Sequence, residues 1–254
     1  MSGERTALVT GGGQRVGAAI CRALSRAGFS VWIHHRSSAA AASALAAELS
    51  ATGPACRTVG GALDTPEGCA AVVAAVGGPL DLLVNNASDY RPAPFGQITA
   101  ADFDHMMAIN ARAPLLLAQG LGPALARSAL PGGGLVLNLA DIGAERPAPG
   151  FLPYAVSKAA LVMLTRALAL EMAPAVRVNA IAPGTVLAPP DLSAAQLAAI
   201  TESVPLRRLG SPEAIADAVV FLALHAPYCT GVVLPVDGGR SLTGPLALDL
   251  PAGP

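Results

Sequence analysis

Short apolar runs alternate along the chain with longer segments whose apolar residues recur every three or four positions. The short runs predict strands at 6–10, 30–34, 55–60, 80–85, 134–139, 176–181 and 231–236. The longer segments predict helices at 14–27, 38–50, 66–76, 100–126, 151–172 and 212–224, with the one at 100–126 broken near Pro114. Strands that alternate with helices are typical of a parallel sheet covered on both faces. We therefore expect an α/β protein with a doubly wound parallel sheet, a Rossmann fold in three layers.

Composition shows that the chain can bury one large core. It has 254 residues, of which 53% are hydrophobic and 13% charged, and it contains no repeat or long linker. A single domain over 1–254 is the simplest expectation. The formal net charge of −1 provides no basic surface for nucleic acid or an anionic membrane.

Targeting and redox features favour a cytoplasmic protein. No basic segment followed by an apolar one opens the chain, and no uninterrupted apolar run reaches the ~18 residues of a membrane span. The four cysteines form no Cys-x-x-Cys pair, which predicts reduced thiols. We expect no metal site.

A glycine-rich turn lies where the first predicted strand meets the first predicted helix. Residues 10–17 read TGGGQRVG. Consecutive glycines let the backbone approach a pyrophosphate, and the N-terminus of the following helix attracts its charge. Arg15 stands where the familiar fingerprints of this loop have glycine, and it adds a cation beside the phosphates or toward a substrate. The turn predicts a dinucleotide site.

The end of the second strand indicates which dinucleotide is bound. Sites for NAD place an acidic residue there to hold the ribose 2′-hydroxyl. This chain has His35, Arg36 and Ser37 instead, and its next acidic residue is Glu48, inside a helix. Arg36 can pair with a 2′-phosphate, which predicts NADPH. The alternative is a surface arginine beside serines that cap the helix.

Tyr154 and Lys158 are four residues apart in the apolar segment 151–172. On a helix this spacing places both side chains on the same face. A cation beside a phenol stabilises the phenolate and lowers a pKa that is ordinarily ~10. The pair predicts a proton donor; the alternative is two ordinary neighbours on a solvated face.

Several motifs together resemble the short-chain dehydrogenases/reductases. They are Thr10-Gly11, Asn85-Asn86-Ala87, Asn110, Tyr154-x-x-x-Lys158 and Pro183-Gly184, and the resemblance extends from residue 6 to about residue 242. Four departures from the common pattern resemble the pteridine reductase branch, which includes dihydromonapterin and dihydrofolate reductases. They are Arg15, the run His35-Arg36-Ser37, Ser88 after Asn86-Ala87, and Asp141 in place of the usual serine thirteen residues before Tyr154.

The resemblance implies a set of site residues. Those implied in catalysis are Asp141, Tyr154, Lys158 and Asn110. Those implied in cofactor binding are Gly11, Gly13, Gln14, Arg15, Val16, His35, Arg36, Ser37, Asn86, Ala87, Ser88, Tyr154, Lys158, Pro183, Gly184 and Val186. Those implied in substrate binding are Arg15, Ser88, Tyr90, Asp141 and Tyr154, with Tyr90 stacked on a pterin. Lys158 is expected to lower the pKa of Tyr154, and Asn110 to fix the helix geometry near Lys158.

Asp141 bears most directly on the substrate. A carboxylate would repel the oxyanion that develops when a ketone is reduced. It can accept hydrogen bonds from the N–H and amino groups of a heterocycle, and when protonated it can relay a proton to Tyr154. The alternative is a solvated loop carboxylate. Asp141 therefore favours reduction of a C=N bond.

The leading hypothesis is an NADPH-dependent pteridine or dihydropteridine reductase, with dihydrofolate as a further candidate substrate. Its alternatives are a carbonyl reductase for 3-oxoacyl or other ketones, and a non-catalytic NADPH-binding regulatory protein. The resemblance also implies a homotetramer through the strand at 231–236. The loop at 187–206 is expected to vary with substrate, the tail at 241–254 to cover a neighbouring subunit or fray, and Asp64 to lie one position later than the usual adenine-site acid.

Overall fold

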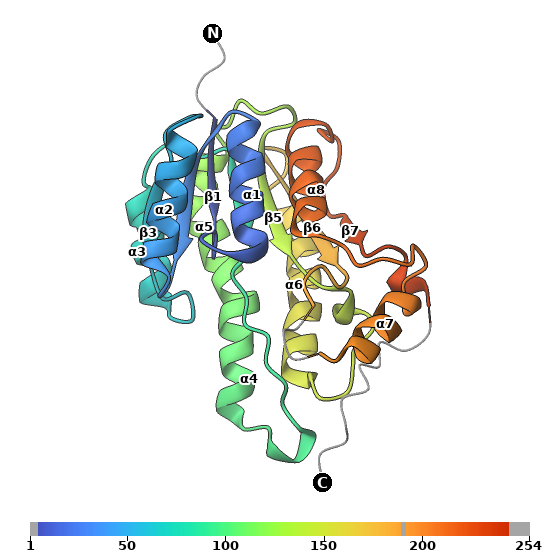
Figure 1. Cartoon of the computed structure of the whole chain (residues 1–254). Helices are drawn as coiled ribbons and strands as arrows, with labels where there is room; N and C mark the ends of the chain where they lie inside the picture. Colours follow the sequence, from blue (N-terminus) through green and yellow to red (C-terminus); the bar gives the residue numbers. More distant parts are fainter. Residues whose placement is uncertain (1–4, 189–191, 244–254) are drawn as a thin grey trace.

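The sheet is the central layer of the molecule. The computed structural model describes residues 5–188 and 192–243. Within these ranges seven parallel strands pair in the order β3-β2-β1-β4-β5-β6-β7 (Figure 1). They are β1 (Arg5–Val9), β2 (Phe29–His35), β3 (Arg57–Gly60), β4 (Leu82–Asn85), β5 (Gly134–Leu139), β6 (Val176–Pro183) and β7 (Val233–Val236). The order reverses between β1 and β4, which is where a doubly wound sheet opens a binding crevice.

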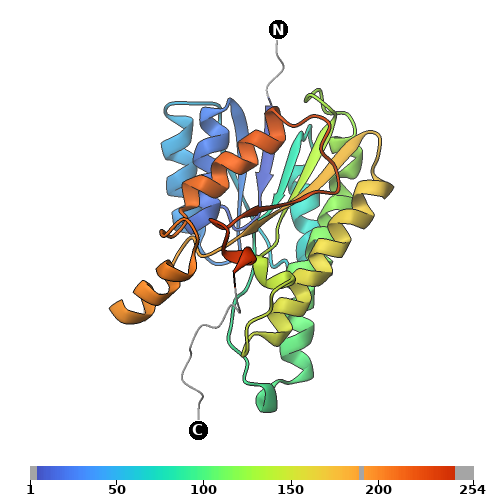
Figure 2. The same ribbon diagram turned by 90° about the vertical axis from the view of Figure 1, so that its right-hand side faces the viewer.

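Helices cover both faces of the sheet (Figure 2). One face carries α1 (Arg15–Arg26), α2 (Ala39–Ser50) and α8 (Pro212–Leu224), and the other carries α3 (Pro66–Val76), α5 (Ala113–Leu125) and α6 (Leu152–Glu171). The remaining helical elements are η1 (Phe95–Gln97), α4 (Ala100–Met107), η2 (Ala108–Arg112), η3 (Ile142–Ala144), α7 (Ala194–Ser203) and η4 (Arg240–Leu242). The predicted three-layer Rossmann fold is confirmed.

Alternate residues of the central strand β1 pack into two separate hydrophobic cores. Ala7 and Val9 of β1 pack toward α1, whereas Leu8 between them packs toward α3 and α5. All three are fully buried, since both faces of the strand are covered. Complete burial of a side chain such as Leu8 contributes ~1.5–3 kcal/mol, so the sheet is held mainly by this two-sided packing.

The predicted strands and helices all occur, with ends that differ from the prediction by at most two residues. The break expected near Pro114 is the π-helical turn η2, which lies just before it. Proline offers no N–H to the carbonyl four residues earlier and its ring clashes with that carbonyl. That carbonyl belongs to Asn110, so the irregular turn falls on a residue of the candidate site.

Helix α7 was not predicted, because the segment 187–206 was interpreted as a loop. Its N-terminus is closed by a capping box in which the Ser193 hydroxyl accepts from the Gln196 N–H and the Gln196 side chain accepts from the Ser193 N–H. The spacing Ser-x-x-Gln is the signal that would have found it. Of the segment, residues 189–191 lie outside the described residues, as do residues 244–254 of the predicted tail.

Helix α6 and the cysteines bear on whether the described part of the chain has membrane spans or disulfides. Helix α6 is long and apolar enough to cross a membrane by length and composition, but 56% of the window concerned is buried inside the protein. It is the longest helix of the core and carries Tyr154 and Lys158 on its inner face. All four cysteines have free thiols.

Candidate active site

One cavity joins most of the predicted site residues. It has a volume of about 1010 Å³ and lies at the carboxyl ends of the strands around β1, β4, β5 and β6. Its walls come from the turn after β1, the segment after β4, the turn after β5, the start of α6, the end of β6 and α7. This position and size suit a dinucleotide together with a small substrate.

The glycine-rich turn approaches the cavity as the sequence predicted. Gly11 has a φ of +60°, a conformation that favours glycine. A Cβ at Gly17 would lie 2.2 Å from the carbonyl oxygen of Gly11, so only glycine lets α1 begin this close to the turn. Arg15 also has a positive φ, +52°, at the position where the fingerprint expects glycine. Arg15 therefore has a strained backbone conformation, and its guanidinium lies at the cavity wall.

Thr10 and Asn86 lock this turn to the end of β4. The Thr10 hydroxyl accepts from the backbone N–H groups of Asn86 and Ala87, both at 2.9 Å. The Asn86 amide donates to the carbonyls of Thr10 at 2.8 Å and Gly11 at 3.1 Å. Two strands that are far apart in sequence thus hold the dinucleotide turn in one position.

His34 is a residue of this region that the sequence did not single out. Its Nδ1 accepts from the Gly11 N–H at 3.1 Å, and its Nε2 donates to the Gly61 carbonyl at 3.0 Å. Both bonds exist together only in the neutral ring with its proton on Nε2. Burial lowers the pKa of His34 to about 4, which keeps the ring neutral. The imidazole therefore couples the glycine-rich turn to the end of β3.

Arg36 reaches the rim of the cavity. Its Nη1 lies 3.9 Å from a carboxylate oxygen of Asp64, and its side chain is 53% exposed. Asp64 also lies 3.9 Å from Nδ1 of His105. The basic group needed for a 2′-phosphate is thus present, with an acidic neighbour that a phosphate would displace.

Three predicted cofactor residues do not line the cavity, namely Gly13, His35 and Ser37. Gly13 packs against Ala42 of α2, and the His35 ring lies over Gly60. Ser37 is exposed, and Ser38 takes its place at the cavity wall. Alternation along β2 explains the position of His35, because the buried His34 faces the cavity and its neighbour His35 faces the opposite side. Gln14, Val16, Ala87, Pro183, Gly184 and Val186 line the cavity as predicted.

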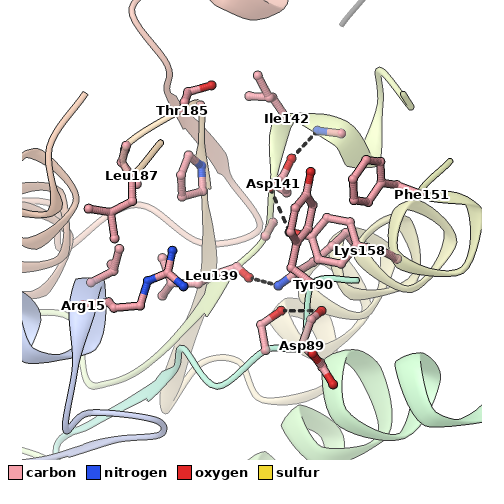
Figure 3. A pocket seen from close by; sticks show the side chains of 18 of the residues that line it. Arg15, Asp89, Tyr90, Leu139, Asp141, Ile142, Phe151, Lys158, Thr185 and Leu187 are labelled. Atoms are coloured by element: carbon pink, nitrogen blue, oxygen red, sulfur yellow. Dashed lines mark hydrogen bonds between the residues drawn. The ribbon is translucent and has the colours of Figure 1, made fainter. Parts of the chain in front are cut away.

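Tyr154 and Asp141 form the polar centre of the site. Figure 3 shows Asp141 beside Lys158 and Tyr90. The Tyr154 hydroxyl donates to Oδ2 of Asp141 at 2.9 Å, and Oδ1 of Asp141 accepts from the Gly143 N–H at 2.6 Å. Asp141 caps η3, which fixes the carboxyl at the end of β5. Nζ of Lys158 donates to the Leu139 carbonyl at 2.7 Å and lies 5.7 Å from the centre of the Tyr154 ring.

The electrostatics of this centre differ from the expectation. Burial raises the pKa of Asp141, and its bonds to Gly143 and Tyr154 offset this only in part. Burial and the Asp141 charge together raise the pKa of Tyr154 well above its ordinary value, so Lys158 does not lower it in this structure. The Asp141 carboxylate accepts a hydrogen bond from the Tyr154 hydroxyl, whereas the Lys158 ammonium donates to the Leu139 carbonyl. Burial lowers the pKa of Lys158 to about 8.

Asn110 supports the site from behind. Its amide nitrogen donates to Ser157 at 2.9 Å, and its amide oxygen accepts from the Ser88 hydroxyl at 2.9 Å. Asn110 is buried in the π turn and does not line the cavity. It joins α6 to the segment after β4, which agrees with the expected role in helix geometry, but no direct bond to Lys158 occurs.

Aromatic rings form one wall of the substrate region. The Tyr90 ring stacks on Phe151 with the two ring centroids 4.6 Å apart. It also meets the Tyr154 ring in a T-shaped arrangement, with those centroids 4.8 Å apart. Arg15 points into the cavity from the opposite side (Figure 3). Phe151 was not predicted, since nothing in its sequence position distinguishes it from a core residue. A planar ring placed between Arg15 and this wall would lie beside Asp141.

Within residues 5–188 and 192–243, no group of three or more His, Cys, Asp or Glu side chains is placed to hold a metal ion. The Rossmann fold, the glycine-rich turn and the buried Tyr-Lys pair together define a dinucleotide-dependent oxidoreductase.

Comparison with known proteins identifies the family. Residues 13–241 match the family model described as enoyl-(acyl carrier protein) reductase. An uncharacterized oxidoreductase of Mycobacterium tuberculosis is 39% identical over 98% of this chain and 95% of its own length. Pteridine reductase 1 of Leishmania tarentolae is 34% identical, with 93% of this chain and 96% of that protein covered. The crystal structure of a blue fluorescent protein from a metagenomic library, in complex with NADPH, has a TM-score of 0.84 and 35% identity, covering 93% of this chain and 97% of that one. The chain belongs to the short-chain dehydrogenase/reductase family.

Proposed function

We propose that this oxidoreductase reduces a C=N bond of a pterin or dihydropterin. The observation that carries the proposal is the 2.9 Å hydrogen bond between Tyr154 and Asp141 inside an aromatic-walled cavity. A carboxyl group in this place can pair with the N–H and amino groups of a heterocycle. The similarity to pteridine reductase 1 of Leishmania tarentolae, at 34% identity, supports this substrate class.

The cofactor is NADPH. It supplies the hydride when bound. Gly11, Gly17 and the N-terminus of α1 leave room for its pyrophosphate, and Arg36 supports the preference for a 2′-phosphate. Lys158 of α6, whose Nζ donates to the Leu139 carbonyl at the end of β5, is expected to orient the hydroxyl groups of the nicotinamide ribose.

Asp141 and Tyr154 deliver the proton that the substrate's ring nitrogen gains. As the substrate carbon gains a hydride, the adjacent ring nitrogen must gain a proton, and the Tyr154 hydroxyl supplies it. Because burial raises the pKa of Asp141, its carboxyl takes up a proton more readily than an exposed carboxyl would and can return it to the tyrosine oxygen. The net change is one hydride to carbon and one proton to nitrogen.

Measuring NADPH oxidation at the nicotinamide absorbance band tests the proposal. We expect turnover of dihydropterins and slow or no turnover of simple ketones and 3-oxoacyl thioesters. Asp141→Ser removes the carboxyl and restores a hydroxyl, so it should lower the pterin rate and leave or raise the ketone rate. Turnover of ketones by the wild type but of no pterin would instead establish a carbonyl reductase. Tight NADPH binding with no turnover of either class would favour a regulatory protein.

We propose that the active form is a homotetramer. Helix α6 exposes Val156, Met163 and Leu170, and the region of α8 and β7 exposes Phe221 and Tyr228. Apolar side chains on two separate faces are typical of two subunit interfaces. Light scattering coupled to size-exclusion chromatography gives the mass; a monomer at micromolar concentration would refute the proposal.

A further inference from the structure

We infer that His105 is a positioning residue that couples binding of the cofactor's 2′-phosphate to the aromatic wall of the substrate region. The inference rests on the proposed contact between Arg36 and that phosphate, and it does not depend on which substrate is reduced. Charged side chains run from the end of β2, past the end of β3 and through α4, to the segment after β4. This ion-pair network consists of Arg36, Asp64, His105, Asp89 and Arg91.

Asp64 lies midway between two partners. Its Oδ2 is 3.9 Å from Nη1 of Arg36 and also 3.9 Å from Nδ1 of His105. Both distances are too long for a hydrogen bond, so the carboxylate is shared between the two groups and fixed to neither. The backbone of Asp64 is held separately, because Nη2 of Arg112 donates to its carbonyl at 2.5 Å. The Asp64 side chain is therefore free to turn toward whichever partner stays available.

His105 binds the second carboxylate of the network directly. Its Nε2 lies 2.9 Å from Oδ2 of Asp89 and donates to it, because an ionised carboxylate only accepts. The same oxygen pairs with Arg91. Burial raises the pKa of Asp89, but hydrogen bonds from His105 and Arg91 outweigh burial and lower the pKa below its ordinary value. Asp89 is thus an ionised group that α4 holds in place.

Asp89 adjoins the aromatic wall. The next residue, Tyr90, stacks on Phe151. The Tyr90 side chain is half exposed, so its position depends on the backbone that carries it as well as on packing. Met106, the residue after His105, is buried in the same apolar cluster as Phe151. Helix α4 therefore supports the wall twice, through the bond from His105 to Asp89 and through the packing of Met106.

The order of the charges sets the direction of the coupling. A phosphate that binds Arg36 takes this cation from Asp64 and adds negative charge beside the carboxylate. Asp64 then keeps His105 as its partner and moves toward Nδ1. The imidazole is held between two carboxylates, which opposes rotation of the His105 side chain away from Asp89. We therefore expect the 2′-phosphate to stabilise the wall and to strengthen substrate binding.

Two adenosine nucleotides isolate the effect of the 2′-phosphate. The nucleotides 2′,5′-ADP and 5′-AMP share the adenosine and the 5′-phosphate, and neither carries a nicotinamide. The chain has three tyrosines, so NMR of ¹³C-labelled tyrosine rings resolves Tyr90, which Tyr90→Phe assigns. We expect saturating 2′,5′-ADP to shift the Tyr90 resonance and saturating 5′-AMP to leave it near its position in the free protein. The same Tyr90 shift with both nucleotides would overturn the inference.

Variants test the route through His105. His105→Gln keeps a donor near Nε2 for Asp89 but presents no group to Asp64. It should abolish the Tyr90 shift that 2′,5′-ADP causes, and so should Asp64→Asn, which removes the carboxylate charge. His225→Gln, at the exposed C-cap of α8, is the matched control and should keep the wild-type shift. A wild-type shift in both His105→Gln and Asp64→Asn would refute the role of His105.

Substrate affinity gives the size of the coupling. Calorimetry measures the dissociation constant of 7,8-dihydrobiopterin for the NADP⁺ and NAD⁺ complexes, in which the substrate is not reduced. We expect binding about fivefold tighter with NADP⁺, the low end of coupling between two sites, and no difference in His105→Gln. If the protein reduces a ketone instead, that ketone replaces the pterin, so failure of the proposed function leaves this test in place. Equal affinities with NADP⁺ and NAD⁺ in the wild type would contradict the coupling.

Discussion

The two ends of the cavity are held in different ways. At the nucleotide end, His34 of β2 and Asn86 after β4 form hydrogen bonds to backbone groups of the glycine-rich turn, and the Thr10 hydroxyl in the turn accepts from the Asn86 N–H. At the substrate end, α7 contains no buried residue and the Tyr90 side chain is half exposed. The nucleotide end is thus built by the backbone of the fold, whereas the substrate end is built by side chains on its periphery. We therefore expect substitutions at the substrate end to change substrate choice while cofactor binding is kept.

Loss of the proton donor should have the largest effect, and it should fall on the substrate end alone. We expect Tyr154→Phe to lower kcat by ~10²–10⁴, since a positioned acid contributes that much. Stopped-flow measurement of NADPH oxidation with a dihydropterin checks this. Glu171→Gln, at the exposed end of the same helix, is the control. A kcat within tenfold of the wild type would show that another group donates the proton.

Reversal of the charge at Arg36 should damage the nucleotide end. Arg36→Glu is expected to weaken NADPH by ~10–100-fold and NADH much less, because charge-assisted hydrogen bonds to a phosphate contribute ~1.5–3 kcal/mol. Fluorescence titration gives both dissociation constants. The same charge change at the exposed Arg26 of α1 should alter neither. Equal losses for NADPH and NADH would mean that Arg36 does not contact the 2′-phosphate.

Alkaline pH should affect the site through Lys158. Its pKa is lowered to about 8, so the ammonium is charged below that pH and loses its proton as pH rises through it. We expect kcat/KM to be level below about pH 8 and to fall about tenfold for each pH unit above it. Lys158→Arg, which stays charged, should remove this fall even if its activity is lower. A profile that persists in Lys158→Arg would assign it to another group.

Two substitutions at His34 separate its two bonds. Asn can keep an acceptor near Nδ1 for Gly11, whereas Gln can keep a donor near Nε2 for Gly61. His34→Gln should therefore weaken NADPH about tenfold, and His34→Asn should weaken it less, while each loses ~1–3 kcal/mol of stability with its buried bond. NADPH titration and urea unfolding measure the two effects. Equal NADPH affinity of the two variants would mean that the bond from His34 to Gly11 does not affect cofactor binding and that His34 has only a structural role.

The smallest effect is expected at Arg15, where the two ends meet. Arg15→Gly relieves a left-handed residue that costs ~1–2 kcal/mol, but it also adds freedom to the unfolded chain. We expect the free energy of unfolding to stay equal or rise by up to ~1 kcal/mol, while KM for the pterin increases. Arg15→Ala keeps the Cβ and should show the loss of affinity without the gain in stability. A clear loss of stability in Arg15→Gly would contradict the strain.

The turn at the nucleotide end was predictable from sequence, although three cofactor residues predicted near it do not line the cavity. This turn depends on glycine spacing and on the order of strand and helix, and both are local properties of the chain. His34 was missed because its role depends on which face of β2 meets Gly11, and two adjacent histidines do not reveal that. Asp141 and Tyr154 were paired correctly by motif spacing. The stacking of Tyr90 on Phe151 joins segments far apart in sequence, so no local pattern indicates it.

The π turn at Ala108–Arg112 determines how α4 is rotated about its axis relative to α5. It adds one residue to what would otherwise be a single straight helix, and each residue turns the chain by ~100°. On one side of the turn α5 packs on α3 and β4, and on the other side α4 packs on α6. Removal of one residue from this turn would rotate α4 against α5, carrying Met106 away from Phe151 and Tyr154 and His105 away from Asp89. The position of the aromatic wall of the substrate region therefore depends on one extra residue in a neighbouring helix.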